Sequence, residues 1–383
     1  MITRRALLGY GAMAGGGALA AACSPSNAGP APAPPVAGTA APAGKAPWEK
    51  EWDELVAAAK LEGKIAFVTR VGTGYRTALE VFEKAFPGIV VEQRQFATPR
   101  LSEPVILAER GAGIYNWDLW EGSSTIALPS FRPKGVLAPL RPLLLRPDAT
   151  DDSKWLNGFE SGWLDNEKKL GYAFGAEVGG WFAIDSRQVG EGELKTFQDL
   201  LAPKWKGRIM LQDVRQGATG GPMTSVRAAQ GDEMVRRLII DQQPTFSQDP
   251  RAITEALIRG QFPIGLGVTK PVLQQFLDQG VGQQVKFVDL PPATYITYTN
   301  AIWYLDRAPH PNASKLFVNW LLTKEGQSAW AEHTQINSLR TDVPPQDPSR
   351  APAPGRRYYA IGPEATIDDF PKTTEYMQKL IVA

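Results

Sequence analysis

Thiols and imidazoles are scarce in this chain, which has one cysteine, Cys23, and two histidines, His310 and His333, among 383 residues. One thiol cannot form an intrachain disulfide or a thiolate zinc site. Neither histidine has a serine or carboxylate partner at a spacing that suggests a catalytic triad. The sequence therefore predicts a protein that is not an enzyme, a secreted hydrolase included, and it predicts no cofactor and no metal site.

An excess of charge of one sign is also missing. The chain contains 41 Lys and Arg residues against 40 Asp and Glu residues, and no run of five like charges occurs. Proteins that bind nucleic acids do so through concentrated basic patches, and none is visible here. We therefore expect no nucleic-acid partner.

The apolar stretch at the N-terminus is short and rich in Gly and Ala, whereas a bilayer-spanning helix takes about 20 predominantly apolar residues. Arg4 and Arg5 precede this stretch, and the small residues Ala20, Ala21 and Ala22 lead to Cys23. This order is typical of a bacterial signal peptide that ends in a lipobox, and the paired arginines are similar to the twin-arginine export motif. We predict that residues 1–22 are a signal peptide and that Cys23 is lipidated. The protein would then be exported and anchored at the cell envelope, in the periplasm or on the outer face of the cytoplasmic membrane, by its lipid alone.

A low-complexity segment follows the cysteine. Residues 24–47 contain seven Pro, eight Ala and three Gly. Such a composition cannot bury enough apolar surface to fold and favours extended, solvated conformations. We predict that residues 23–47 form a tether between the membrane and a folded part that begins at Trp48.

The folded part is long enough for two lobes, since single cores stop growing near 250 to 300 residues. Its first segment alternates helix and strand. The apolar spacing predicts a helix over residues 51–61, a strand over 65–68, a helix over 75–85 and a second strand from residue 89. This alternation is typical of an α/β domain.

Two loops in this first segment are candidates for ligand contact. Gly72-Thr73-Gly74 joins a predicted strand to a predicted helix, where free backbone N–H groups can hold an anion, although the glycines could serve only a tight turn. Residues 120–124 follow a short apolar strand, and ligands of open α/β sheets bind outside the carboxyl ends of strands.

Two longer segments carry a family resemblance, residues 200–209 (LLAPKWKGRI) and residues 308–327 (APHPNASKLFVNWLLTKEGQ). Through them the chain resembles the extracellular solute-binding proteins of ABC importers, in the branch that contains the ferric-ion and phosphonate-type receptors. The resemblance implies the bilobal periplasmic-binding-protein fold, with two α/β lobes joined by hinge strands and one small ligand between them. It also implies delivery of that ligand by a monomer to an ABC permease and its ATPase. The predicted limits are 48–140 plus 296–345 for the first lobe and 141–295 plus 346–383 for the second.

The sequence departs from the ferric receptors at the expected iron donors. In that branch two adjacent tyrosines follow an element that here reads Gly260-Gln261-Phe262-Pro263, but the corresponding positions are residues 268–271, with Lys270 among them. A histidine of the family's first loop is also absent, since Arg70 occupies that stretch. Bare ferric ion would find neither phenolate nor imidazole donors, so we do not expect direct iron binding.

The candidate loops instead supply cations, Arg70, Arg215 and Lys270, together with two helix N-termini. Guanidinium and ammonium groups that converge on a small site favour an anion. Glu121 and Glu177 could accept from a hydroxyl or amine of a substituted carboxylate or zwitterion, or each could simply form a salt bridge with one of the cations. The predicted ligand-binding residues are Arg70, Gly72, Thr73, Gly74, Tyr75, Trp120, Glu121, Ser123, Ser124, Glu177, Arg215, Gln216, Gly217, Lys270 and Tyr298.

We therefore predict a substrate-binding component that captures a small anionic solute, carrying a carboxylate or a phosphonate, by lobe closure. Two alternatives stay open. The ligand could be an anionic chelate of a metal such as a ferric complex, because cations bind its carboxylates without touching the ion. The protein could also be a sensory lipoprotein that feeds a signalling receptor instead of a permease.

Overall fold

The computed structural model describes residues 45–214 and 219–382. The signal peptide, Cys23 and most of the tether lie outside these residues, as do three predicted ligand-binding residues, Arg215, Gln216 and Gly217. Within the described ranges, none of the helices is both long enough and apolar enough to cross a membrane.

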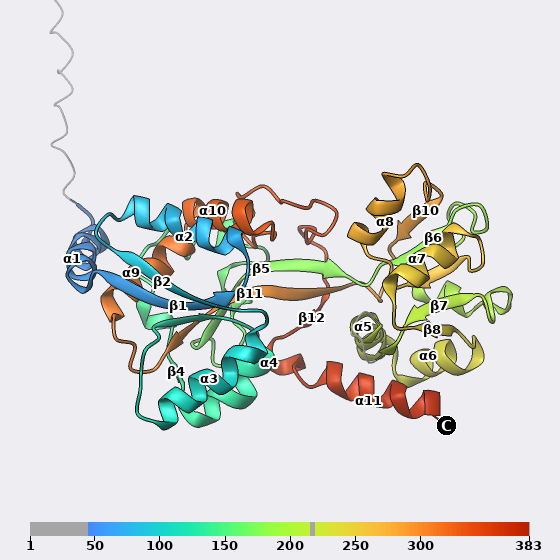
Figure 1. Cartoon of the computed structure of the whole chain (residues 1–383), viewed down its shortest axis with the longest axis horizontal. Helices are drawn as coiled ribbons and strands as arrows, with labels where there is room; N and C mark the ends of the chain where they lie inside the picture. The colour runs from blue at the N-terminus through green and yellow to red at the C-terminus, as the bar shows by residue number, and fades with distance from the viewer. Residues whose placement is uncertain (1–44, 215–218, 383) are drawn as a thin grey trace, which may run out of the picture. The chain divides into compact units, whose positions relative to one another are not determined.

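Two mixed β-sheets, each accompanied by helices, make up the folded unit (Figure 1). The first sheet has the order β12-β11-β3-β1-β2, with β4 and β5 also paired to β11. Its strands are β1 (Lys64–Arg70), β2 (Val90–Phe96), β3 (Leu119–Glu121), β4 (Leu137–Ala138), β5 (Gly171–Gly179), β11 (Tyr295–Leu305) and β12 (Tyr359–Ile361). The second sheet has the order β10-β6-β9-β7-β8. Its strands are β6 (Phe182–Asp185), β7 (Ile209–Gln212), β8 (Thr245–Ser247), β9 (Ile264–Leu266) and β10 (Val285–Val288).

The helices follow the strands closely in sequence, as α/β connections require. Those that accompany the first sheet are α1 (Pro47–Glu62), α2 (Thr73–Ala85), α3 (Pro99–Gly111), α4 (Ser124–Ile126), α9 (Pro311–Leu321) and α10 (Lys324–Thr334). Those that accompany the second are α5 (Gly220–Gln230), α6 (Asp232–Arg236), α7 (Pro250–Ile258), α8 (Lys270–Leu277) and α11 (Asp369–Val382). The predicted alternation over residues 51–91 is confirmed by α1, β1, α2 and β2, with ends shifted by a few residues. β1 runs parallel to both β2 and β3, so the carboxyl ends of these strands meet at one edge of the sheet.

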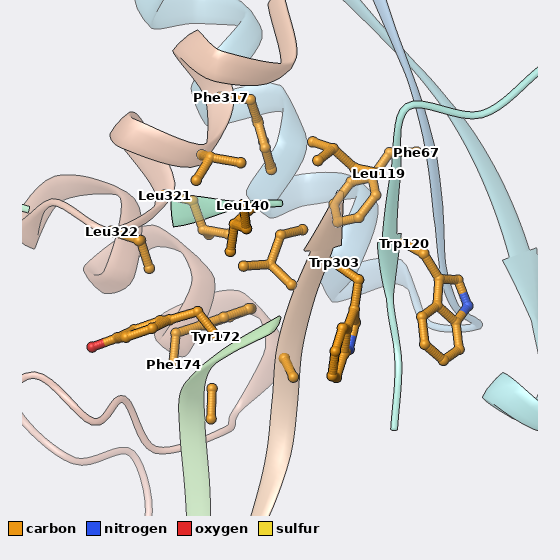
Figure 2. Close-up of a cluster of buried hydrophobic side chains, with 14 of the residues drawn as sticks. Phe67, Leu119, Trp120, Leu140, Tyr172, Phe174, Trp303, Phe317, Leu321 and Leu322 are labelled. Atoms are coloured by element: carbon orange, nitrogen blue, oxygen red, sulfur yellow. The ribbon is translucent and has the colours of Figure 1, made fainter. Parts of the chain in front are cut away.

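The core of the first sheet is aromatic. α9 buries one face completely, and Figure 2 shows its Phe317 and Leu321 directed toward Phe67 of β1 and Leu119 of β3. The rings of Phe67 and Phe317 meet edge to face with centroids 5.3 Å apart. This packing shows that residues 311–321 of the segment that carries the family resemblance form a helix with a buried apolar face.

The long strand β11 contains a bulge beside the carboxyl end of β1. Tyr298 is opposite Ala176 of β5 and Asn300 is opposite Gly175, so Thr299 is an extra residue in the ladder. Bulges bend a strand and redirect the groups next to them. β5 and β12, whose residues fall in the predicted second lobe, both pair with β11 in the first sheet. The limits of the lobes themselves stay a prediction.

Candidate functional site

Arg70 ends β1 and is held by a buried carboxylate. Its Nη2 and Nε donate to Glu121 at 2.6 and 3.2 Å, and Nη2 also donates to the carbonyl oxygen of Thr299 in the bulge of β11. The Glu121 side chain is fully buried, whereas that of Arg70 is 27% exposed. Arg70 therefore forms a salt bridge with Glu121, which is one of the two roles that the sequence left open for these residues. Nη1 of Arg70 makes no hydrogen bond to any residue in the described part of the chain.

The surroundings of Arg70 keep its guanidinium group charged. Burial opposes the charge of Arg70, but the Coulomb attraction and hydrogen bond of Glu121 outweigh it and raise the pKa of Arg70. Asn300, which is fully buried, donates from Nδ2 to Glu121 at 2.8 Å. Its Oδ1 and the hydroxyl of Thr299 are buried and have no hydrogen-bond partner among the described residues. Such orphaned polar atoms are uncommon in folded proteins and point to a polar site next to the bulge.

Tyr75 and the glycine turn stand beside Arg70. The Tyr75 ring centroid lies 5.9 Å from the Arg70 guanidinium carbon, and burial raises the pKa of Tyr75, so its phenol is neutral. Gly72 precedes α2 and provides no side-chain cap, so no capping side chain occupies the N–H groups of Thr73 and Gly74, while that of Tyr75 donates to the Gly72 carbonyl oxygen at 3.2 Å. Glycine at position 74 is also required for a steric reason, because a Cβ there would lie 2.0 Å from the backbone oxygen of His333.

A second group of charges is centred on Glu177 of β5. Arg350 Nη2 lies 2.6 Å from a Glu177 carboxylate oxygen, and Lys270 Nζ lies 3.1 Å from both carboxylate oxygens of Asp347. Burial raises the pKa of Glu177, opposed by the positive charges of Arg350, Arg70 and Lys270, while Asp347 adds to the rise. Three cations from different parts of the chain thus act on one carboxylate. We call the set Arg70, Glu121, Glu177, Lys270, Asp347 and Arg350 the charged cluster.

Lys270 occupies the first position of α8, directly after the loop 267–269 at the carboxyl end of β9. Thr269 precedes the helix, but its side chain makes no capping hydrogen bond. Lys270 therefore adds a full positive charge to the partial positive charge of a helix N-terminus. Sequence analysis did not identify Asp347 or Arg350, because they lie in a proline-rich segment without periodicity. Contacts with distant parts of the chain bring Asp347 and Arg350 to the charged cluster.

Other predicted site residues lie elsewhere. The predicted ligand contact of Trp120 is corrected by the structure. The Trp120 side chain is completely buried in the core, and its Nε1 donates to Ser102 at 2.9 Å. Ser123 caps α4 by accepting from the backbone of Thr125 at 3.2 Å, and Ser124 is buried next to it. Within the part of the chain that the structure covers, no side-chain hydrogen bond joins these three residues to the charged cluster.

Tyr298 faces a separate cavity of about 70 Å³. Burial raises the pKa of Tyr298, so its phenol is also neutral. The cavity is lined by Leu156, Asn157, Ser161, Ile296, Tyr298, Leu339, Tyr358 and Ala360. The structure therefore brings together Arg70, Tyr75, Glu121, Glu177 and Lys270, with the glycine turn adjacent. The side chain of Trp120 lies in the core and that of Tyr298 lines the other cavity. As to metals, the described residues contain no group of three or more His, Cys, Asp or Glu side chains placed to hold an ion.

Comparison with known proteins gives one family and one fold. Residues 77–354 match a family described as bacterial extracellular solute-binding protein. A sequence search of curated proteins found no match.

Several solved structures are similar over most of the chain. IdiA (FutA) from Trichodesmium, in complex with iron and citrate, has 17% identity and a TM-score of 0.63, covering 83% of this chain and 99% of its own. Iron-bound HitA from Pseudomonas aeruginosa has 16% identity and a TM-score of 0.57, covering 83% and 99%. Ferric iron-binding protein A from Mannheimia haemolytica, in an open conformation, has 11% identity and a TM-score of 0.62, covering 83% and 98%. At these identities the likeness concerns the fold, and it confirms the predicted bilobal α/β class.

Proposed function

Because the chain belongs to the bacterial extracellular solute-binding proteins, a family of binding proteins and not of enzymes, we propose that it is the solute-capturing component of an ABC importer. We further propose that its solute is small and carries an anionic group, a carboxylate or a phosphonate. Its partners would be a membrane permease and the ATPase that drives it. The export signal and the lipid at Cys23 are part of the same proposal.

The observation that supports an anionic solute is the placement of Arg70 and Lys270. Each cation stands next to the N-terminus of a helix, α2 or α8, that has no side-chain cap. Both cations act on the same carboxylate, Glu177, so they lie within electrostatic reach of one small region. A carboxylate or phosphonate can accept from ammonium, guanidinium and backbone N–H donors together.

This placement also supports capture by closure. Arg70 extends from the first sheet, and Lys270 begins a helix that accompanies the second. A solute that binds both cations interacts with both sheets at once and stabilises the closed arrangement over any arrangement in which only one contact forms. Since Arg and Lys bind carboxylates without contacting a metal, an anionic metal chelate fits the same proposal.

The decisive experiment starts from protein purified from its own host. Native mass spectrometry would detect a retained small molecule, and calorimetry would then compare its binding to the wild type and to Lys270→Ala. We expect the variant to bind at least about fivefold more weakly, the loss of one charge-assisted hydrogen bond. Lys372→Ala is the matched control, because Lys372 also pairs with an aspartate but lies on the exposed face of α11.

Two results would contradict the proposal in different ways. Unchanged affinity of Lys270→Ala removes Lys270 from the site. A retained molecule without an anionic group overturns the proposed solute class. Genes for a permease and an ATPase beside this one support import, whereas a gene for a signalling receptor in their place supports the sensory alternative.

A further inference from the structure

The proline-rich segment after α10 contains a turn, residues 347–350, that is fixed by its backbone. Asn337, almost fully buried, accepts from the backbone N–H of Asp347 and donates to its carbonyl oxygen, both at 2.9 Å. At the other end of the turn, the carbonyl oxygen of Arg350 accepts from Val178 of β5 at 2.8 Å. Backbone groups therefore fix both ends of the turn, and within it the Asp347 carboxylate also accepts from the backbone N–H of Ser349.

From this fixed turn two side chains of opposite charge reach the charged cluster. Asp347 contacts Lys270 with both carboxylate oxygens, and Arg350 contacts Glu177. Burial raises the pKa of Asp347, but hydrogen bonds from Ser349 and Lys270 outweigh it and hold the pKa below its usual value. Asp347 is thus ionised at neutral pH and places a carboxylate on the cation that we assign to the solute.

We propose that Asp347 is a built-in counter-anion of the solute site, whose carboxylate occupies Lys270 until the anionic group of the solute replaces it. This inference rests on the proposed function and adds two residues, Asp347 and Arg350, to the site. It agrees with the proposed solute class, since a carboxylate or phosphonate accepts from an ammonium group as the Asp347 carboxylate does.

The exchange is accessible because the pair is partly exposed. The side chains of Lys270 and Asp347 are 44% and 35% exposed, so water and solutes can reach both. Ion pairs at such positions are weak. Asp347 therefore competes with the solute without excluding it, and removing its charge should tighten anion binding by about two- to fivefold.

The test uses Asp347→Asn, because an asparagine side chain can still accept from the backbone N–H of Ser349 as Asp347 does at 3.0 Å. Calorimetric titrations with succinate and with methylphosphonate at low salt would compare the wild type, Asp347→Asn, Lys270→Ala and the double variant. Asp289→Asn is the control, since Asp289 pairs with Arg356 of the same segment and its loss also removes one negative charge.

We expect Asp347→Asn to bind at least one of the two anions about two- to fivefold more tightly, Asp289→Asn to match the wild type, and the gain to vanish when Lys270 is also replaced. If Asp347→Asn and the wild type bind both anions with equal affinity, the role of Asp347 as a counter-anion is overturned and the proposed function stays intact. A gain that persists in the double variant overturns it as well, because the effect then does not act through Lys270. Absence of binding to every variant overturns both this inference and the proposed anion class.

Discussion

Glu121 is a carboxylate with no exposed surface, and its charge is compensated chiefly by Arg70. Removing one partner of a buried ion pair leaves an uncompensated charge, which typically costs about 3–5 kcal/mol. Because the Arg70 side chain is 27% exposed, we expect Arg70→Gln to lower the free energy of unfolding by about 2–3 kcal/mol. Denaturant titration followed by tryptophan fluorescence would measure it.

The double variant Arg70→Gln with Glu121→Gln tests the cause. It should recover part of the loss, because the buried charge is then gone. Arg236→Gln serves as the comparison, since Arg236 pairs with Glu233 on the surface and its loss should change stability little. A double variant less stable than Arg70→Gln would contradict this account of the pair.

Glu177 gives a prediction about pH. Burial raises its pKa above the value in the unfolded chain, so ionisation of Glu177 costs stability as the pH rises through its folded pKa. Glu177→Gln should therefore be more stable than the wild type at pH 7, and the difference should shrink as the pH falls toward the pKa of free glutamate. Thermal melts between pH 4 and pH 8 would show this trend.

Glu160 offers a comparison of opposite sign. Burial raises its pKa, but the hydrogen bonds and ion pairs with Arg141 and Lys168 together outweigh burial and lower it. Glu160→Gln should thus be less stable than the wild type at pH 7, with the difference again vanishing in acid. If both variants change in the same direction, the assigned environment of Glu177 is wrong. A buried carboxylate whose ionisation lowers stability, as that of Glu177 does, is typical of a functional site.

At the scale of single elements, α2 depends on a close approach to α10. A Cβ at Gly74 would lie 2.0 Å from the His333 backbone oxygen, a contact that neither helix can relieve without moving. We expect Gly74→Ala to lower the free energy of unfolding by about 1–3 kcal/mol, as overpacking does. Gly111→Ala, in α3 with open space around it, should be neutral or stabilising by up to about 1 kcal/mol. Equal stability of the two variants in a thermal melt would contradict the steric role.

Elements with local signals were predictable from the sequence. The spacing of Leu316, Phe317, Trp320 and Leu321 predicts a buried helical face, and α9 has it. The bulge at Thr299 has no such signal, because it depends on how β11 pairs with β5, more than a hundred residues earlier in the chain. Pairing register between distant strands is set by the whole sheet.

The residues of the candidate site were likewise predictable only in part. The family resemblance identifies Arg70 and Lys270, because they occupy the stretches where the ferric receptors have their iron donors, and the rule that ligands bind at the carboxyl ends of strands identifies residues 120–124. Trp120 satisfies the same rule but is in the core, since one residue along a strand exchanges the two faces of a sheet. Asp347 and Arg350 satisfy no local rule, and only the fold brings them to Lys270 and Glu177, respectively.

For the whole molecule, the last prediction concerns the anchor. Cys23 is the only cysteine, so a lipid on a thiol has one possible acceptor. Expressed in a bacterium that processes lipoproteins, the full chain should partition into the detergent phase of Triton X-114 and be released from membranes by detergent alone. Cys23→Ser should move to the aqueous phase, because in this proposal the lipid on that thiol is the only anchor. The binding experiments above should give equal affinities for both forms, since the proposed site begins at Arg70, well beyond the tether. If Cys23→Ser stays with the membrane, the anchor is not a lipid on that thiol.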